Sequence, residues 1–314
     1  MTETARQSNT VPLRKRLERG AGRLALAIVL KPVRAMSFSS AQRTGRVLGA
    51  LLYHLLGRYR RVAHKNLALV YGDVMSPRDR TKIAKDVFVH FGQAVCEFLM
   101  LPEMPPEELA ARVEAHGAEH LAAAKTAGKG ILVVSGHFGN FEVLAPWLQL
   151  QGYAVNVVAR KANDPRIDEM LQGTRAQSGA TVHLRGSSGR SVLQCLKRGE
   201  VLALLFDQNA GDVFVPFFGM QTGTTNGPAR IHLHTGAPIV FMWCISKPDG
   251  GFRLEIEEPV VFPPTQDRAA DEMAVTTLLN ARLEAKIKQY PSQWLWLHDR
   301  WRNSPHVFQN KDQH

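Results

Sequence analysis

The chain has 314 residues, of which 45% are hydrophobic and 21% are charged, and it carries a formal net charge of +11. Such a chain can form one large domain or two small ones with a sizeable core, which excludes an intrinsically disordered protein. The three cysteines, Cys96, Cys195 and Cys244, are far apart and lack a C-x-x-C spacing, so we expect neither a disulfide framework nor a cysteine zinc site.

The positive charge is concentrated near the N-terminus. Residues 1–66 contain 14 Lys or Arg side chains and two Glu, a net charge of +12, so the rest of the chain is close to neutral. Between these charges lie the apolar runs RLALAIVL (23–30) and VLGALLYHLL (47–56). Arms that bind nucleic acid are typically polar with aromatic stacking residues. The composition therefore favours an anionic membrane as the partner and argues against nucleic acid.

Neither apolar run is long enough to cross a bilayer, which needs roughly 18–20 uninterrupted apolar residues. Lys31, Pro32 and Arg34 interrupt the pattern after the first run. We expect helices that lie on the membrane surface, with their apolar side down and their arginines toward anionic headgroups. The alternative is an ordinary basic helical subdomain packed against the core. The region lacks a small-residue cleavage site after a short apolar core, so we predict no secretory signal peptide.

Along the chain, the hydrophobic pattern changes once. From Met1 to about Gly128, apolar residues recur at spacings of three and four, which predicts helices. After Gly128, short apolar runs alternate with helical stretches. We expect strands at 131–135, 154–159, 181–184, 201–206, 238–246 and 252–258. We expect helices near 141–151, 164–177, 188–198 and 271–290.

Buried strands that alternate with helices predict right-handed crossovers and a parallel arrangement. The expected fold class is therefore α/β, with a largely parallel central sheet flanked by helices and a basic helical membrane-associated N-terminal part. We expect this N-terminal region to span residues 1–66. The α/β domain, helical until about residue 128, would span 67–303 and a C-terminal tail 304–314.

The stretch SGHFGNFEVL follows the first predicted strand, where ligands of open parallel sheets collect. It places His137 in a turn and Glu142 in the first turn of a helix. A spacing of five on one continuous helix separates residues by about 140°, so the pair meets only if the chain bends at Gly136 and Gly139. A carboxylate beside an imidazole fixes the tautomer that a general base requires. Alternatively, His137 is a turn residue and Glu142 a favourable acid at a helix N-terminus.

The segment GHFGNFE resembles the H-x4-D/E element of the lysophospholipid acyltransferase superfamily. Later elements are similar to its branch of lipid A biosynthesis (late lauroyl or myristoyl) acyltransferases. Together they cover residues from about 45 to 303, and the resemblance implies a glycerolphosphate-acyltransferase-like fold. The elements are VVARKANDPRID, LKRGEVLALLFDQNAG, VFVPFFGMQTGTTNGPARIHLHTGAPIV and YPSQWLWLHDRWR.

The resemblance implies an enzyme that moves a fatty acyl group from acyl carrier protein or CoA to a hydroxyl of a membrane glycolipid, foremost a lipid A precursor. It implies no cofactor and no covalent acyl-enzyme. His137 would deprotonate the acceptor hydroxyl, and Glu142 would orient and charge-stabilise His137. Arg160 would lie near the reacting carbonyl or a substrate phosphate, and Asp207 would be an acid of the same pocket. Without the resemblance, Arg160 is a surface residue ending a strand and Asp207 a turn residue.

Other residues are less clearly chemical. Backbone N–H groups around Gly139 and Asn140 are candidates for holding the tetrahedral intermediate. Phenylalanines of the F-F-G element are candidates for an acyl-chain pocket, although such residues are more often core. Thr224 is explained equally well by helix capping. The residues expected to bind substrate are Gly139, Asn140, Asn163, Gln208, Phe217, Phe218, Gly219 and Thr224.

Two histidine pairs, His116 with His120 and His232 with His234, have no third ligand in view, so we favour structural histidines and expect no metal. The tail tryptophans fit either the headgroup level of a membrane or packing beneath the sheet. The lipid A interpretation implies a peripheral or monotopic protein at the cytoplasmic face of the bacterial inner membrane. Acyl carrier proteins are acidic, so the basic N-terminal surface is a candidate docking site.

Two alternatives remain open. The same chemistry could act on another acceptor, namely a phosphatidylinositol mannoside, a lysophospholipid or an ornithine lipid. The chain could also be a catalytically silent membrane-binding protein that keeps the fold. Many relatives begin with a transmembrane helix, whereas the corresponding region here is interrupted by charged residues and a proline.

Overall fold

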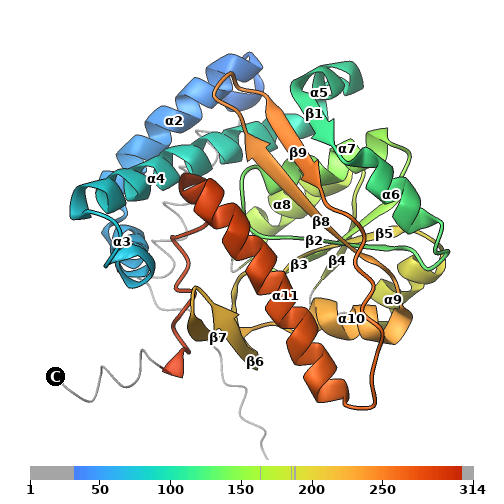
Figure 1. Ribbon diagram of the computed structural model, residues 1–314. Helices are drawn as coiled ribbons and strands as arrows, with labels where there is room; N and C mark the ends of the chain where they lie inside the picture. The colour runs from blue at the N-terminus through green and yellow to red at the C-terminus, as the bar shows by residue number, and fades with distance from the viewer. Residues whose placement is uncertain (1–31, 163, 185, 187–188, 306–314) are drawn as a thin grey trace, which may run out of the picture.

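A seven-stranded sheet forms the centre of the molecule in the computed structural model, which describes residues 32–162, 164–184, 186 and 189–305 (Figure 1). The strand order is β1-β9-β8-β2-β5-β3-β4. Strands β8, β2, β5, β3 and β4 are parallel, while β9 is antiparallel to β8 and parallel to β1. The predicted α/β class is confirmed. The strands are β1 (Val113–His116), β2 (Ile131–Ser135), β3 (Val155–Ala159), β4 (Thr181–Leu184), β5 (Val201–Leu205), β8 (Ile239–Ser246) and β9 (Phe252–Ile256).

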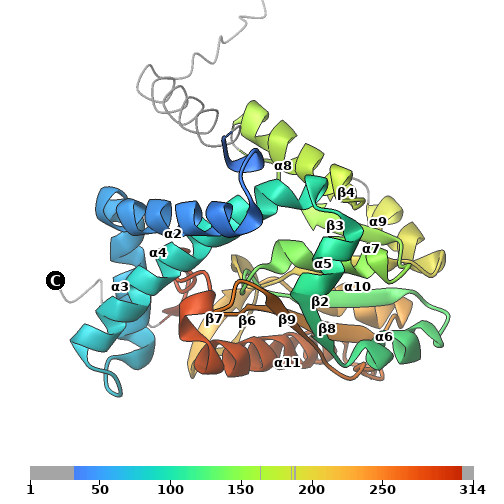
Figure 2. The same cartoon turned by 90° about the horizontal axis from the view of Figure 1, so that it is seen from above.

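Alternate side chains of the central strands enter two different cores. In β2, Leu132 and Val134 join the core under α9, α10 and α11, whereas Ile131 and Val133 join the core under α5, α6 and α7. Figure 2 shows α11 on one side of the sheet and α7 and α8 on the other. The helices are α5 (Pro106–Arg112), α6 (Ala118–Lys125), α7 (Leu144–Leu150), α8 (Pro165–Gln177), α9 (Gly189–Lys197), α10 (Gly227–Thr235) and α11 (Arg268–Gln289).

Three further helices, α2 (Phe38–Leu55), α3 (Gly57–Tyr71) and α4 (Pro77–Met100), form a layer at one end of the sheet. Gly49 of α2 lies so close to α4 that an added Cβ would overlap the carbonyl oxygen of Phe88. The boundary expected after residue 66 falls inside α3. No helix within the described ranges is long and apolar enough to cross a membrane. The run at 23–30 lies outside these ranges.

The sequence pattern missed three strands. β1 interrupts the stretch expected to be helical to residue 128, because this four-residue edge strand is mostly exposed and has no apolar run. The second sheet is a hairpin of β6 (Asn209–Phe217) and β7 (Met220–Thr224). Its turn residues Phe218 and Gly219 have φ of 51° and 74°, the left-handed conformation that a two-residue hairpin turn requires.

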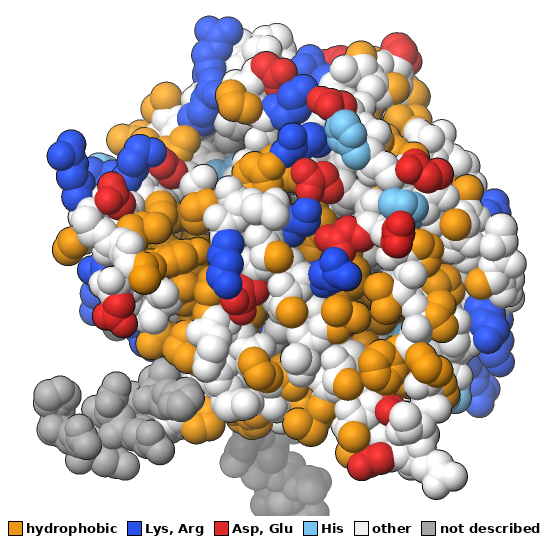
Figure 3. Space-filling model, in the orientation of Figure 1, with side chains coloured by type: hydrophobic (Ala, Val, Ile, Leu, Met, Phe, Trp, Pro, Cys, Tyr) orange, Lys and Arg blue, Asp and Glu red, His pale blue; other side chains and the backbone are white. Residues whose placement is uncertain are grey.

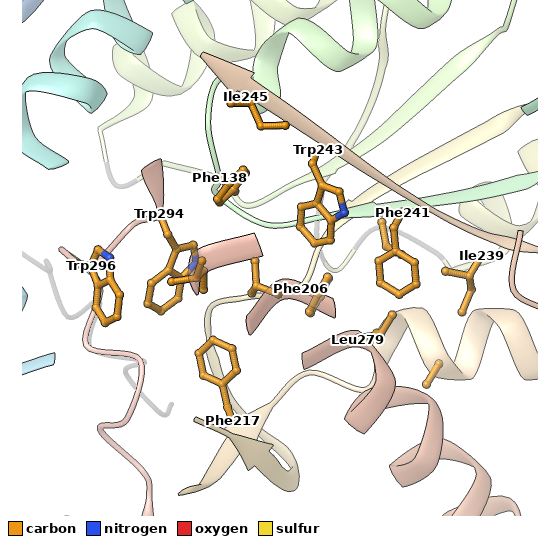
Figure 4. Packing of buried hydrophobic residues seen from close by; sticks show 14 of the residues in the cluster. Phe138, Phe206, Phe217, Ile239, Phe241, Trp243, Ile245, Leu279, Trp294 and Trp296 are labelled. Carbon is orange, nitrogen blue, oxygen red and sulfur yellow. The ribbon is translucent and has the colours of Figure 1, made fainter. Parts of the chain in front are cut away.

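The segment after α11 packs against α4 and α11 and carries three buried tryptophans. Trp294 is 1% exposed, and both Trp296 and Trp301 are fully buried. The Trp294 and Trp296 rings are 4.8 Å apart, and Phe217 stacks on Trp301 at 5.5 Å. Figure 4 shows Trp294 between Phe138 and Phe217, with Trp296 beside it. The tryptophans thus belong to the core that also contains Phe138 and Phe217, and their burial excludes the headgroup placement.

Candidate active site

The site forms where β2 and β5, hydrogen-bonded neighbours in the sheet, end side by side. Ser135 of β2 is in register with Leu205 of β5, so His137 and Asp207, two residues further along each chain, meet beyond the sheet edge. The imidazole Nδ1 of His137 lies 2.7 Å from Oδ1 of Asp207. The backbone N–H of His137 donates to Oδ2 of Asp207 at 2.8 Å, and the indole N–H of Trp294 donates to the same Oδ2 at 2.9 Å.

Two glycines allow the turn around His137 to approach its neighbours. A Cβ at Gly136 would lie 2.9 Å from a Leu283 methyl group and 3.2 Å from Oδ2 of Asp207. Gly139 has φ of +56°, and a Cβ there would overlap the carbonyl oxygen of Cys244. The predicted bend is therefore present, and its tight packing requires the absence of side chains.

Glu142 does not hydrogen-bond His137, so the predicted orienting contact is absent, although its charge raises the pKa of His137 as expected. Its carboxylate instead forms a bidentate ion pair with Arg175 of α8, with Oε1 2.6 Å from Nη2 and Oε2 3.1 Å from Nε. Residues 141–143 form a 3₁₀ turn, and the ring of Phe141 packs edge-on against His137 at 5.0 Å. The phenyl ring thus contacts the imidazole, while Glu142 turns to α8. The expected imidazole–carboxylate pair exists, but its carboxylate is Asp207.

The electrostatics of the pair favour an ionised Asp207. Burial by itself lowers the pKa of His137, but the charge and hydrogen bond of Asp207 and the charge of Glu142 outweigh it, so this pKa lies above 6.5. Burial raises the pKa of Asp207, yet the charge of His137 and the hydrogen bonds from His137 and Trp294 hold it at about 2. An ionised Asp207 keeps the proton of neutral His137 on Nδ1 and leaves Nε2 as the basic nitrogen.

The backbone N–H groups of Gly139 and Asn140 are not available to an oxyanion, contrary to expectation. The N–H of Gly139 donates to the Gln293 carbonyl at 2.8 Å, and that of Asn140 donates to the Cys244 carbonyl at 3.0 Å. The Asn140 side chain donates to buried Glu97 at 2.7 Å. These hydrogen bonds anchor the turn and occupy the donors that were expected to face the intermediate.

A cavity of about 1150 Å³ lies at the carboxyl ends of β2, β3 and β5, with His137 in its wall. Val157 and Ala203 pack against one core, and Val158 and Leu204 pack against the other, yet all four line the cavity. The cavity therefore reaches both faces of the sheet. Ligand pockets for small molecules typically measure about 300–1000 Å³, so this cavity has room for a long apolar chain.

Two further predicted residues line this cavity. Arg160 directly follows β3 and is exposed, and no ion pair joins it to a carboxylate in the described part of the chain. The side-chain nitrogen of Gln208 lies 3.4 Å from Nε2 of His137. Asn163 lies outside the described residues.

Four other predicted substrate contacts do not line this cavity. Phe217 is buried in the core, and Phe218 and Gly219 form the hairpin turn. Thr224 is buried, and its hydroxyl accepts a hydrogen bond from Arg300 at 2.7 Å. These four residues instead belong to the hairpin and its packing, so this cavity gives no support for them as substrate contacts.

Sequence reasoning missed Arg175 and Trp294 as site residues. Arg175 lies 33 residues from Glu142, and Trp294 lies 87 residues from Asp207. In the sequence, only the position of Trp294 within the element YPSQWLWLHDRWR pointed to this residue, and no motif pointed to Arg175.

Three of the four histidines in the two predicted pairs have structural partners, and the fourth, His234, lines the cavity. His116 lies 2.7 Å from a Glu114 carboxylate oxygen, and His120 bonds the Ile256 carbonyl at 2.8 Å. His232 bonds the Ala237 carbonyl through Nδ1 and accepts the Phe262 N–H at Nε2. The described residues contain no group of three or more His, Cys, Asp or Glu side chains arranged to hold a metal ion.

The fold and the site define an α/β protein with a histidine–aspartate pair in the wall of a large, mainly apolar cavity. Residues 14–303 match the family described as bacterial lipid A biosynthesis acyltransferase. The chain belongs to this family and is an acyltransferase.

Two acyltransferases are similar to this chain over most of its length. The chain is 31% identical over 270 residues to the lipid A biosynthesis lauroyltransferase of Escherichia coli K12, covering 84% of this chain and 85% of that protein. It is 27% identical over 247 residues to a phosphatidylinositol mannoside acyltransferase of Mycolicibacterium smegmatis, covering 76% and 78%. A solved structure, the 1-acyl-sn-glycerophosphate acyltransferase of Thermotoga maritima, matches with a TM-score of 0.38 and 14% identity, covering 81% of this chain and 99% of that one.

Proposed function

We propose that this protein transfers a fatty acyl group from a thioester of acyl carrier protein or CoA to a hydroxyl of a lipid A precursor. One observation carries the mechanism: the His137–Asp207 pair leaves Nε2 basic in the wall of a cavity large enough for an acyl chain. The identity to a lipid A lauroyltransferase supports the acceptor. The identity to a phosphatidylinositol mannoside acyltransferase makes that glycolipid the second candidate.

In the proposed reaction, Nε2 of His137 takes the proton of the acceptor hydroxyl as the oxygen attacks the thioester carbonyl. A carbon–oxygen bond forms, and the carbonyl oxygen gains the negative charge of a tetrahedral intermediate. The carbon–sulfur bond then breaks, the imidazolium returns the proton to the thiolate, and an ester and a free thiol leave. Asp207 stabilises the imidazolium between these steps.

Arg160 is the candidate donor to the developing oxyanion or to a substrate phosphate. It is exposed at the cavity and has no ion pair with a described carboxylate, so its guanidinium is free to bind an anion. Arg175 is less available because both of its hydrogen bonds go to Glu142. Gln208, beside Nε2 of His137, is placed to contact the acceptor hydroxyl.

The proposed location is the cytoplasmic face of the bacterial inner membrane, with α2 and α3 against the lipid. Val47, Leu51 and Leu55 of α2 recur every four residues and are 60%, 53% and 74% exposed. Such a stripe on a helix matches the apolar side of an interfacial helix. Hydrophobic side chains also gather beside Lys and Arg at the left of Figure 3, over α3 and the adjoining end of α4.

Basic side chains of the same helices complement an anionic lipid surface. Arg43, Arg46, Arg58 and Arg61 are exposed, and within the described ranges none of them is ion-paired with a carboxylate. Each basic residue close to an anionic membrane contributes roughly 1 kcal/mol to binding. The exposed arginines and the exposed apolar stripe thus both support α2 and α3 as the side of the protein that faces the membrane.

The function is tested with purified protein, lauroyl-acyl carrier protein or lauroyl-CoA, and a lipid A precursor or a phosphatidylinositol mannoside as acceptor. We expect His137→Ala to lower the rate by a factor on the order of 10²–10⁴, since it removes the general base. His116→Ala is the control, because His116 is exposed and is not one of the residues that line the cavity. A folded His137→Ala variant with the wild-type rate would refute the mechanism. If the wild-type protein acylated the phosphatidylinositol mannoside and not the lipid A precursor, the mannoside would be the acceptor.

A further inference from the structure

We infer that Trp294 is a positioning residue for the general base, because its indole N–H holds the Asp207 carboxylate in the rotation that orients the His137 ring. The inference rests on the proposed role of His137. Trp294 and Asp207 are 1% and 2% exposed, so water does not readily replace their 2.9 Å hydrogen bond.

The two oxygens of Asp207 have separate partners. Oδ1 faces Nδ1 of His137 at 2.7 Å, whereas Oδ2 receives the His137 backbone N–H at 2.8 Å and the indole N–H of Trp294 at 2.9 Å. Two donors on Oδ2 resist rotation of the carboxylate and thereby keep Oδ1 directed at the ring. Catalytic geometry commonly depends on such supporting hydrogen bonds.

Trp294 is itself held in place. Its ring contacts Phe217 at 5.6 Å and Trp296 at 4.8 Å between centroids. The preceding residue, Gln293, accepts the Gly139 N–H through its carbonyl oxygen, so one tail segment anchors both the turn that carries His137 and the carboxylate that orients it. Figure 4 shows the ring of Trp294 extending from this segment toward Phe217.

Other charged groups surround the pair and stay unchanged when Trp294 is replaced. Glu142 and Arg175 lie on the cavity side. His298 and Arg300 come from the C-terminal segment, and both interact with Asp207 through charge. Arg300 makes its hydrogen bonds to Gly223, Thr224 and Asn280 and none to Asp207. The indole N–H is therefore the one tail donor that bonds this carboxylate in the described chain.

The effect of Trp294→Phe has a defined sign. A hydrogen bond to Asp207 stabilises the lone anion more than the ion pair with protonated His137, so it lowers the affinity of His137 for its proton. Its loss should raise the pKa of His137 and move the acid limb of the rate profile up by about half a pH unit. The less restrained ring should also lower kcat about tenfold with little change in KM.

Trp243→Phe is the matched control. Trp243 is fully buried in the same core, and its indole also donates to a carboxylate, that of Glu257 at 2.8 Å. Both variants are compared by acyl-transfer rates across pH and by NMR titration of ring-labelled His137 without substrate. We expect only Trp294→Phe to move the two midpoints upward. Equal midpoints in the two folded variants overturn the inference.

A measurement on the wild-type protein decides the matter if Trp294→Phe does not fold. The indole 15N–1H signal of Trp294 should shift through the pH range in which His137 titrates, with the same midpoint, while that of Trp243 stays constant. A Trp294 signal that ignores this titration refutes the positioning role. A failure of the proposed function would be recognised by a different result: His137→Ala would retain acyl transfer, whatever the NMR titrations show.

Discussion

Replacing Asp207 by Asn tests the central pair with almost no change in shape. Oδ2 of Asp207 accepts two N–H groups, so the Asn side-chain oxygen should occupy that position and its NH₂ group should face Nδ1 of His137. An NH₂ group can only donate there, which forces Nδ1 to accept and moves the ring proton to Nε2. The neutral imidazole then presents a proton to the acceptor hydroxyl where the wild type presents a lone pair.

The expected loss of activity is large for two reasons. The wrong tautomer has no basic Nε2, and without the Asp207 anion the protonated imidazole is no longer stabilised. We expect kcat to fall by a factor on the order of 10³–10⁴, about 4–5 kcal/mol of activation free energy. The pH dependence should change as well. His137 must be neutral to act, so wild-type activity should rise with pH through a midpoint above 6.5. In the variant this midpoint should move to lower pH, because the charge that raised the pKa of His137 is absent.

The assay measures acyl transfer to the lipid acceptor between about pH 5 and pH 9 for wild type, Asp207→Asn and Asp212→Asn. Asp212 is an exposed acid outside the cavity lining and serves as the control. A folded Asp207→Asn variant with a rate within about fivefold of wild type, or with an unmoved acid limb, would contradict the assignment of Asp207.

Two further predictions concern the helical layer. Leu55→Glu, at a position 74% exposed on α2, should reduce co-sedimentation of the protein with anionic vesicles several-fold. Val261→Glu, at a position 63% exposed between β9 and α11, is the control and should bind like the wild type. Equal binding of the two variants would show that α2 does not contact the membrane. Gly49→Ala should lower the free energy of unfolding by about 1–3 kcal/mol in urea titrations, because the new methyl overlaps the Phe88 carbonyl of α4. Gly57→Ala has open space around it and should change stability little, so similar losses in both variants would disprove the close packing.

Much of the fold was predictable because its strands are short apolar runs set off by polar or glycine residues. The strands expected at 131–135 and 181–184 have these bounds in the structure. Where the signal was missing, prediction failed for a physical reason. β1 is held by its pairing with β9, a long-range contact that leaves no apolar pattern. The hairpin contains Pro216 and a left-handed Phe218, both unusual in a strand–turn–strand sequence.

The site was predicted only in part. Spacing along the chain pointed to Glu142 as the partner of His137, because those residues are close in sequence. The strand order instead places β5 beside β2 and brings Asp207 to the imidazole from 70 residues away. Residues that lie two positions beyond the ends of two paired strands come close in space. Which strands are paired, however, depends on the packing of the whole sheet.

By itself, the sequence determined the alternation of strands and helices, the basic N-terminal region, and the positions of His137 and Asp207 just after strands, since these depend on local periodicity and composition. Only the tertiary structure decided which carboxylate holds the imidazole, that Glu142 binds Arg175, and that Trp294 lies behind Asp207. Those contacts join residues separated by 33 to 87 positions, and only the pairing of strands and the burial of the tail bring them within hydrogen-bond distance.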